Sequence, residues 1–315
     1  MTTNPRIHEP MCKPGLHAGC AGLACTSCAW VDVRFAFFGT PYVARDTLAI
    51  LDAHGFRPAV VVTAPDTPRG RGLILTPSET RVWADEHGIP VLTPEQIDAS
   101  VIESIRTYGC AYAIVVAYGK ILPQALLDAF PRGALNVHYS LLPKYRGASP
   151  VESALLNGDT ETGVSIQKMV YALDAGDILA SEKTLIGASE TTIDLRARLI
   201  QIGGELLVRM LPEYLAGALA PMPQDPAQVT RAGKMKKEDG YITLGQDDEM
   251  NWRKYRAYAQ WPRVSFEAER NGDRFRVTIV TAHFANGKFL PDIVKPAGKN
   301  EMSYADFVRS GVKIL

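Results

Sequence analysis

The feature that most constrains the fold is an alternation of short apolar runs with amphipathic helical patterns along the first two thirds of this 315-residue chain. Residues 35–38, 59–62 and 111–118 form apolar runs, each of a length that suits one buried strand. Strands that alternate with helices pack as a parallel sheet with crossover helices on its faces. The pattern therefore predicts a Rossmann-like α/β domain over residues 34–220, closed by a long amphipathic helix at residues 193–215.

Two common nucleotide-binding motifs are absent from the sequence. The first apolar run ends at a single glycine, Gly39, and not in the G-x-G-x-x-G pattern that binds dinucleotides. A G-x-x-x-x-G-K-[ST] phosphate loop is also missing. These absences disfavour both nicotinamide chemistry and nucleoside-triphosphate chemistry.

Asn136 and His138 occupy alternate positions after a short apolar run. In an extended segment, residues two apart point the same way, so both side chains would project together from the end of a strand. The amide can donate to a carbonyl oxygen, and the imidazole can donate, accept or carry charge near neutral pH. A strand end with two satisfied polar residues is the simpler alternative. A second polar cluster at residues 174–177 favours a functional site.

Several segments together resemble the active-site segments of the formyltetrahydrofolate-dependent formyltransferases. They are Asn136–His138, the Ser140–Pro143 turn, Tyr145–Gly147 and Leu173–Asp177. The resemblance runs from about Arg34 to the C-terminus, and it is strongest to the members that formylate methionyl initiator tRNA. Tyr139 departs from the motif, because the family often has a small residue or proline there. We expect its side chain to point away from Asn136 and His138 and to change only the packing.

The resemblance implies that Asn136, His138 and Asp174 are the catalytic residues. Formyl transfer to an amine passes through a tetrahedral species whose oxygen becomes negative, so it needs donors at that oxygen and an acceptor for a proton. Asn136 and His138 suit the oxygen, and Asp174 suits orienting His138 and handling protons through water. Ser140 lacks a G-x-S-x-G setting, so no covalent intermediate is expected. The motif contains no metal-binding pattern, so no metal is expected.

The formyl donor implied by the resemblance is 10-formyltetrahydrofolate. Ligands of open parallel sheets bind outside the carboxyl ends of the strands, and the resemblance assigns that rim to the pterin. The predicted folate-binding residues are Gly119, Ile121, Ser140, Leu141, Leu142 and Pro143. Each leucine taken alone is typical of core packing, so the interpretation depends on the rim as a whole.

Residues 65–72 have the composition of a loop and carry two arginines, Arg69 and Arg71. Such a loop can be a solvated connection, or a basic finger that becomes ordered on a phosphate backbone. The resemblance favours the second interpretation. It implies that Arg69 and Arg71 bind the acceptor end of a tRNA.

The C-terminal part begins with a proline-rich linker, residues 221–237, and continues as a second domain over residues 238–315. Short alternating segments separated by two Asn-Gly turns predict a small β-barrel, which the resemblance specifies as OB-like. From Arg231 onward there are 16 Lys+Arg against 11 Asp+Glu, which suggests a polyanionic partner. Lys234, Lys236 and Lys237 are the predicted tRNA-binding lysines. Aromatic residues with lysines can equally form a core with a soluble face.

Residues 1–33 are expected to be a flexible leader. They hold four of the five cysteines, of which one pair has C-x-x-C spacing, so a zinc site is the alternative. The leader has no apolar core long enough for a signal peptide or a membrane span. We expect Cys110 to be a buried thiol, and the protein to be a cytoplasmic monomer that does not bind membranes.

Two alternative functions remain open at this stage. The first is formylation of a sugar amine or a glycine-derived nucleotide by the same three residues; the basic loop and the C-terminal domain argue against it. The second is a non-catalytic nucleic-acid-binding protein with a vestigial folate site; the presence of Asn136, His138 and Asp174 argues against that.

Overall fold

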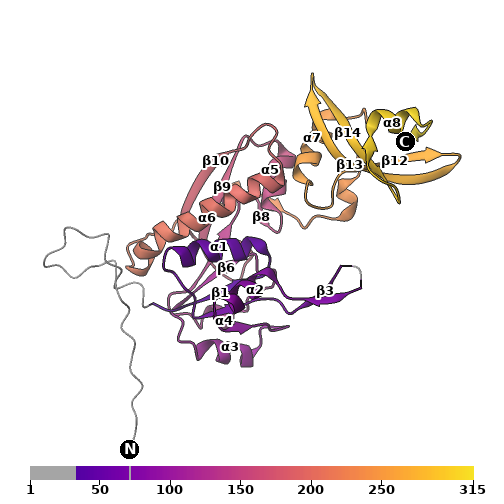
Figure 1. Cartoon of the computed structure of the whole chain (residues 1–315). Helices are drawn as coiled ribbons and strands as arrows, with labels where there is room; N and C mark the ends of the chain where they lie inside the picture. The colour runs from indigo at the N-terminus through magenta and orange to yellow at the C-terminus, as the bar shows by residue number, and fades with distance from the viewer. Residues whose placement is uncertain (1–32, 71) are drawn as a thin grey trace, which may run out of the picture.

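The computed structural model describes residues 33–70 and 72–315. Residues 1–32, which hold the predicted leader and its four cysteines, lie outside the described residues, as does Arg71. The described chain forms a larger α/β domain followed by a smaller β domain at one end of the molecule (Figure 1). In the described part, no helix is both long and apolar enough to cross a membrane.

A seven-stranded sheet in the order β10-β9-β7-β6-β1-β2-β5 forms the centre of the larger domain. From one edge to the other the strands are Ile178–Leu185, Glu161–Lys168, Ala134–His138, Tyr112–Val116, Phe35–Gly39, Val60–Val62 and Val91–Leu92. The five strands from β7 to β5 pair in parallel, which confirms the predicted α/β architecture. At the other edge, β9 runs antiparallel to both of its neighbours, β7 and β10, so the sheet as a whole is mixed. The loop that joins β9 to β10 is too short for the crossover that parallel strands require.

The apolar run of β1 is buried on both sides because alternate residues face two different cores. Phe35 and Phe37 face α1 (Tyr42–Ala53) and α6 (Thr192–Leu215), whereas Phe38 faces the core that includes α3 (Ala99–Arg106). Strands buried on both faces read as continuous apolar runs rather than alternating ones. The remaining helices of this domain are α2 (Glu79–Glu86), α4 (Gln124–Leu127) and α5 (Pro150–Asn157). Cys110 is buried, as predicted, and burial raises the pKa of its thiol to about 11.

Helix α6 packs closely against the sheet because it presents a glycine, Gly203, to the strands. A Cβ at this position would lie 3.0 Å from Val137 Cγ1 and 3.6 Å from the ring of Tyr139. The Tyr139 hydroxyl lies 3.4 Å from Thr47 Oγ1 on α1. Tyr139 therefore occupies the α6 side of the sheet, away from the side chains of Asn136 and His138, as expected.

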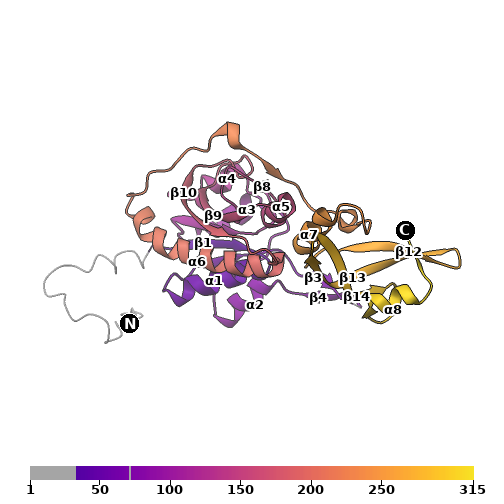
Figure 2. The same ribbon diagram turned by 90° about the horizontal axis from the view of Figure 1, so that it is seen from above.

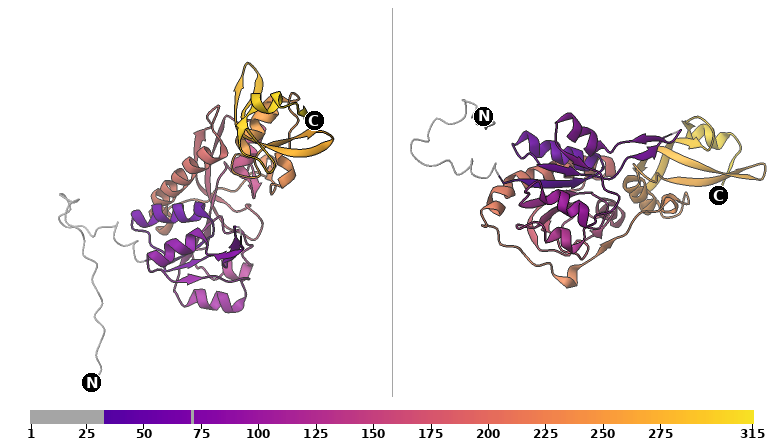
Figure 3. Two further views of the ribbon diagram at one scale, coloured as in Figure 1. Left: turned by 45° about the vertical axis from the view of Figure 1, so that its right-hand side comes forward. Right: turned by 90° about the horizontal axis from the view of Figure 1, so that it is seen from below.

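The predicted loop at residues 65–72 is part of a two-stranded ribbon, β3 (Thr67–Arg69) and β4 (Ile74–Thr76). The composition predicted a loop here, but three of its residues, Thr67–Arg69, form a strand that pairs with Ile74–Thr76 on the far side of the turn. Its apolar residues Leu73, Ile74 and Leu75 are 73%, 69% and 68% exposed. The ribbon and the C-terminal β domain extend from the same side of the larger domain (Figures 1 and 3).

The C-terminal domain consists of α7 (Asp248–Ala257), α8 (Tyr304–Arg309) and a five-stranded antiparallel sheet. The sheet order is β15-β14-β13-β12-β16, formed by Met302–Ser303, Lys288–Pro296, Asp273–Ala285, Ser265–Arg270 and Lys313–Ile314. The predicted small β domain is confirmed, but among the described residues no pairing joins β15 to β16, so the sheet is not a closed barrel. The two edge strands are only two residues long, and the intervening α8 buries Phe307 against Phe266 instead.

The segment between α6 and the C-terminal domain lies on the surface of the larger domain (Figure 2). Met222 and Ile178 exchange two backbone hydrogen bonds of 2.8 and 2.9 Å. Further along, β11 (Arg231–Ala232) pairs in parallel with β8 (Arg146–Gly147). This predicted linker is therefore fixed to the α/β domain at both ends of its course.

Gly203→Leu should lower the free energy of unfolding by about 1–3 kcal/mol, the usual cost of overpacking a tight core. Leucine has a higher helix propensity than glycine, which offsets part of the predicted loss of stability. Denaturant titration followed by circular dichroism measures it. Gly233→Leu is the control, because a Cβ at Gly233 meets nothing within 4 Å. Equal stability of both variants would contradict the close helix–sheet contact.

Candidate active site

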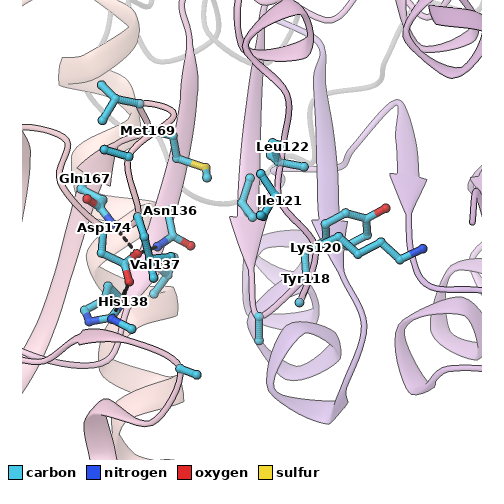
Figure 4. A pocket seen from close by; sticks show the side chains of 18 of the residues that line it. Tyr118, Lys120, Ile121, Leu122, Asn136, Val137, His138, Gln167, Met169 and Asp174 are labelled. Atoms are coloured by element: carbon cyan, nitrogen blue, oxygen red, sulfur yellow. Dashed lines mark hydrogen bonds and ion pairs between the residues drawn. The ribbon is translucent and has the colours of Figure 1, made fainter. Parts of the chain in front are cut away.

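The three predicted catalytic side chains meet beside β7, next to the loop between β9 and β10. Asn136 Nδ2 donates to Asp174 Oδ1 at 3.4 Å, and His138 Nδ1 lies 3.7 Å from Asp174 Oδ2. Figure 4 shows the three side chains pointing toward one another. The alternation of side chains along β7 puts Asn136 and His138 on one side of the sheet, and the loop brings Asp174 to them.

The imidazole of His138 is neutral at neutral pH. Burial lowers its pKa below the ordinary value, although the Asp174 carboxylate and the hydrogen bond to Tyr145 act in the opposite direction. Its Nε2 lies 2.9 Å from the carbonyl oxygen of Tyr145, and a carbonyl only accepts, so Nε2 carries the hydrogen. Nδ1 is then the free lone pair, next to Asp174. Because Nε2 is already engaged, His138 is set to accept a proton at Nδ1, and the predicted contact of His138 with the substrate oxygen stays a prediction.

The Asp174 carboxylate is surrounded by hydrogen-bond donors. The backbone N–H of Gly147 donates to Oδ2 at 2.8 Å, and Gln167 Nε2 donates to Oδ1 at 2.9 Å. The side chain is only 10% exposed, so these donors replace water around the carboxylate. The backbone of Asp174 has a φ of +49°, a conformation that L-residues rarely adopt and that is found most often at functional sites.

These residues form one wall of a cavity of about 590 Å³, a size that suits a small-molecule ligand. Its polar lining residues include Asn136, His138, Gln167 and Asp174. The apolar part of the lining includes Val115, Tyr118, Ile121, Leu122 and Met169. In Figure 4, Ile121 and Leu122 lie across the cavity from Asn136 and Asp174. The arrangement places a few convergent polar groups against an apolar wall.

The predicted folate-binding residues divide into two groups. Gly119 and Ile121 line the cavity. Ser140, Leu141, Leu142 and Pro143 do not belong to its lining. Their turn is occupied by internal hydrogen bonds, since the Ser140 hydroxyl donates to the Lys144 carbonyl and the Leu142 N–H donates to the Ser165 hydroxyl. The assignment of the Ser140–Pro143 turn to the folate therefore stays a prediction.

Sequence reasoning missed Gln167, whose amide donates to Asp174 and whose Oε1 is buried without a hydrogen-bond partner in the described structure. It lies opposite Asn136 in the antiparallel register of β7 and β9. A signal was present: Ser165 and Gln167 are polar residues at alternate positions of a strand whose intervening residue, Ile166, is a core residue. Two buried polar side chains on one face of a strand indicate a site on that face.

The predicted tRNA-binding residues lie outside the cavity. Arg69 belongs to β3, and Arg71 lies outside the described residues. Lys234, Lys236 and Lys237 are exposed and follow β11 on the way to the C-terminal domain. Arg69 and the three lysines therefore lie on two surface elements, separate from the three catalytic candidates.

His138→Gln should make the protein less sensitive to acid. In the unfolded wild type the imidazole takes up a proton as the pH falls through about 6.5, whereas the folded protein resists that protonation. The wild type should therefore lose stability between pH 7.5 and 5.5, and the variant should lose less. Thermal denaturation at both pH values measures the difference. His54→Gln, which changes an exposed imidazole, is the control, and equal losses in all three proteins would contradict a buried neutral His138.

The sequence and the fold are both similar to those of known formyl transferases. Residues 33–211 match the formyl transferase family. A methionyl-tRNA formyltransferase of Citrifermentans bemidjiense is 42% identical over 260 residues, which cover 82% of this chain and 82% of that relative.

Two solved structures share the fold. The N-formyltransferase of Helicobacter canadensis, in complex with folinic acid and dTDP-3-aminofucose, has a TM-score of 0.61 at 17% identity and covers 81% of this chain and 88% of its own. The methionyl-tRNA formyltransferase of Clostridium thermocellum has a TM-score of 0.54 at 17% identity and covers 83% of this chain and 97% of its own. With a family match over more than half its length and a relative of 42% identity, this chain belongs to the formyl transferase family.

Proposed function

We propose that this enzyme transfers the formyl group of 10-formyltetrahydrofolate to the α-amino group of methionyl initiator tRNA. The observation that carries the proposal is the convergence of Asn136, His138 and Asp174 at one cavity. The similarity to methionyl-tRNA formyltransferases along most of the chain supports the acceptor. The reaction supplies formylated initiator tRNA for translation, and we place it in the cytoplasm.

In the proposed reaction the amine attacks the formyl carbon directly. Asn136 Nδ2 donates to the carbonyl oxygen as this oxygen becomes negative. The amide nitrogen has two N–H groups, and the 3.4 Å contact with Asp174 uses only one of them. The proton of the attacking amine passes to His138 Nδ1, directly or through water. The Asp174 carboxylate then stabilises the imidazolium. Collapse of the tetrahedral species expels the folate nitrogen, which takes up the proton.

The apolar wall of the cavity is the proposed site for the folate. Ile121 is 76% exposed beside the cavity, and Tyr171 and Leu173 of the facing loop are 64% and 66% exposed. Exposed apolar side chains around a cavity indicate a surface that a flat, partly apolar ligand covers. Gly119 lets a ligand approach the backbone closely, and the formyl carbon then faces Asn136.

The proposed tRNA surface comprises the β3–β4 ribbon and the segment that leads into the C-terminal domain. Arg69 of the ribbon would contact phosphates, as would Arg71, Lys234, Lys236 and Lys237. The extension of the ribbon and the C-terminal domain from the same side supports one continuous partner (Figure 3). The exposed residues 73–75 fit contact with base faces at an RNA end.

Asp174→Asn tests the catalytic assignment. The variant keeps the size of the side chain but removes the charge that stabilises imidazolium at His138, so kcat should fall by at least about two orders of magnitude. Folate binding should remain within about a factor of two. Transfer of radiolabelled formyl from 10-formyltetrahydrofolate to methionyl initiator tRNA measures the rate. Near-normal turnover of the variant would contradict the role of Asp174.

Replacing both Arg69 and Arg71 with alanine tests the ribbon. The loss of phosphate contacts should raise the KM for tRNA and make its salt dependence shallower, because fewer counterions are released on binding. Folate binding should be unchanged. An Arg34→Ala, Arg106→Ala double variant, which removes two exposed arginines elsewhere, is the control. Unchanged tRNA kinetics and an unchanged salt slope in the Arg69/Arg71 variant would show that the ribbon does not bind tRNA.

A further inference from the structure

The linker contributes one side chain, Gln224, to the loop that carries Asp174. Gln224 Nε2 donates to the carbonyl oxygens of Asp174 at 2.9 Å and Gly176 at 2.6 Å. Its Oε1 accepts from Arg146, at 3.0 Å from Nε and 2.8 Å from Nη2. Gln224 is partly buried, whereas its sequence neighbours Pro223 and Asp225 are exposed.

These contacts require an amide. The two carbonyls only accept hydrogen bonds, and the guanidinium of Arg146 only donates them, so the side chain between them must do both. A carboxylate at position 224 would keep the contact with Arg146 and lose both contacts with the loop. A hydroxyl or an ammonium cannot span both sides in this way. The amide is therefore matched to its place between the loop and Arg146.

The loop needs such support because Asp174 has a positive φ. A residue other than glycine remains in this region only where surrounding contacts hold it. Gln224 holds the carbonyl of Asp174 itself and that of Gly176, two residues further along. The direction of the Asp174 side chain follows from the backbone that Gln224 fixes.

The same linker also holds the segment that contacts His138. Thr230 Oγ1 accepts from the Tyr145 N–H at 2.8 Å, and the Tyr145 carbonyl accepts from His138. The φ of Gly147 is +128°, and a Cβ there would lie 2.2 Å from the carbonyl oxygen of Ala232. Only glycine permits this approach of the linker to a residue whose N–H binds Asp174.

We infer that Gln224 is a positioning residue for formyl transfer, which orients the Asp174 carboxylate against His138 from the linker. This inference rests on the proposed function of the site. The relative position of His138 and Asp174 therefore depends on a linker that lies outside the sheet and its helices. This linker continues directly into the C-terminal domain.

Gln224→Ala and Gln224→Glu test the inference in the full-length protein. Both variants should lower kcat at least about tenfold, because a small misplacement of a catalytic group costs that much or more. The binding of tetrahydrofolate should remain within about twofold. Gln228→Ala is the matched control from the same linker, since its side chain bonds only to Asp225 in the described structure. That control should keep the wild-type kcat.

The glutamate variant distinguishes support of the Asp174 loop from the contact with Arg146 alone. It retains an acceptor for Arg146 but cannot donate to the loop, so it should be as slow as the alanine variant. Near-normal kcat in Gln224→Glu would overturn the inference. A lower melting temperature with an unchanged kcat in both Gln224 variants would overturn it as well.

A second readout needs no substrate. Asp174 raises the pKa of His138, so misplacing the carboxylate in Gln224→Ala should lower that pKa further. A titration of the His138 ring followed by NMR measures it, with Gln228→Ala as the control. An unchanged His138 pKa in Gln224→Ala overturns the inference. Failure of the wild type to formylate methionyl-tRNA contradicts the proposed function instead, and leaves the NMR outcome to decide the role of Gln224.

Discussion

The buried carboxylate of Asp174 is the group on which the rest of the site depends. A carboxylate removed from water must be surrounded by donors, and here they come from distant parts of the chain. Gly147 lies on β8, Gln167 on β9 and Asn136 on β7. Each donor fixes the position of its own segment relative to the loop. The arrangement leaves His138 with a free Nδ1 next to a negative charge, which is a suitable acceptor for the proton of an attacking amine.

The scaffold holds this group through packing on the far side of the sheet. Val137 and Tyr139 lie against Gly203 of α6, which sets the orientation of β7 and so of Asn136 and His138 on its other side. The linker acts on the same site from outside, through Gln224 and β11. His138 and Asp174 are thus positioned between a core contact at Gly203 and a surface contact at the linker. The linker that makes the surface contact continues directly into the C-terminal domain.

Much of this architecture follows from local patterns in the sequence. Apolar runs identified β1, β2 and β6, and the spacing of Asn136 and His138 indicated a shared face. The proximity of Asp174 came only from resemblance, because local patterns do not reveal contacts between distant segments. The antiparallel direction of β9 was missed since apolar periodicity carries no information on strand direction. The role of Gln224 was hidden because a polar residue in a proline-rich linker has no periodic signal.

The central claim is that this site serves an aminoacyl-tRNA acceptor, although the fold is shared with an N-formyltransferase solved with an amino-sugar nucleotide. The most direct test is to compare the two acceptors with the purified enzyme and 10-formyltetrahydrofolate, at equal acceptor concentrations. We predict rapid formylation of methionyl initiator tRNA and little or no formylation of a nucleotide-linked amino sugar. Preferential formylation of the amino sugar would contradict the account.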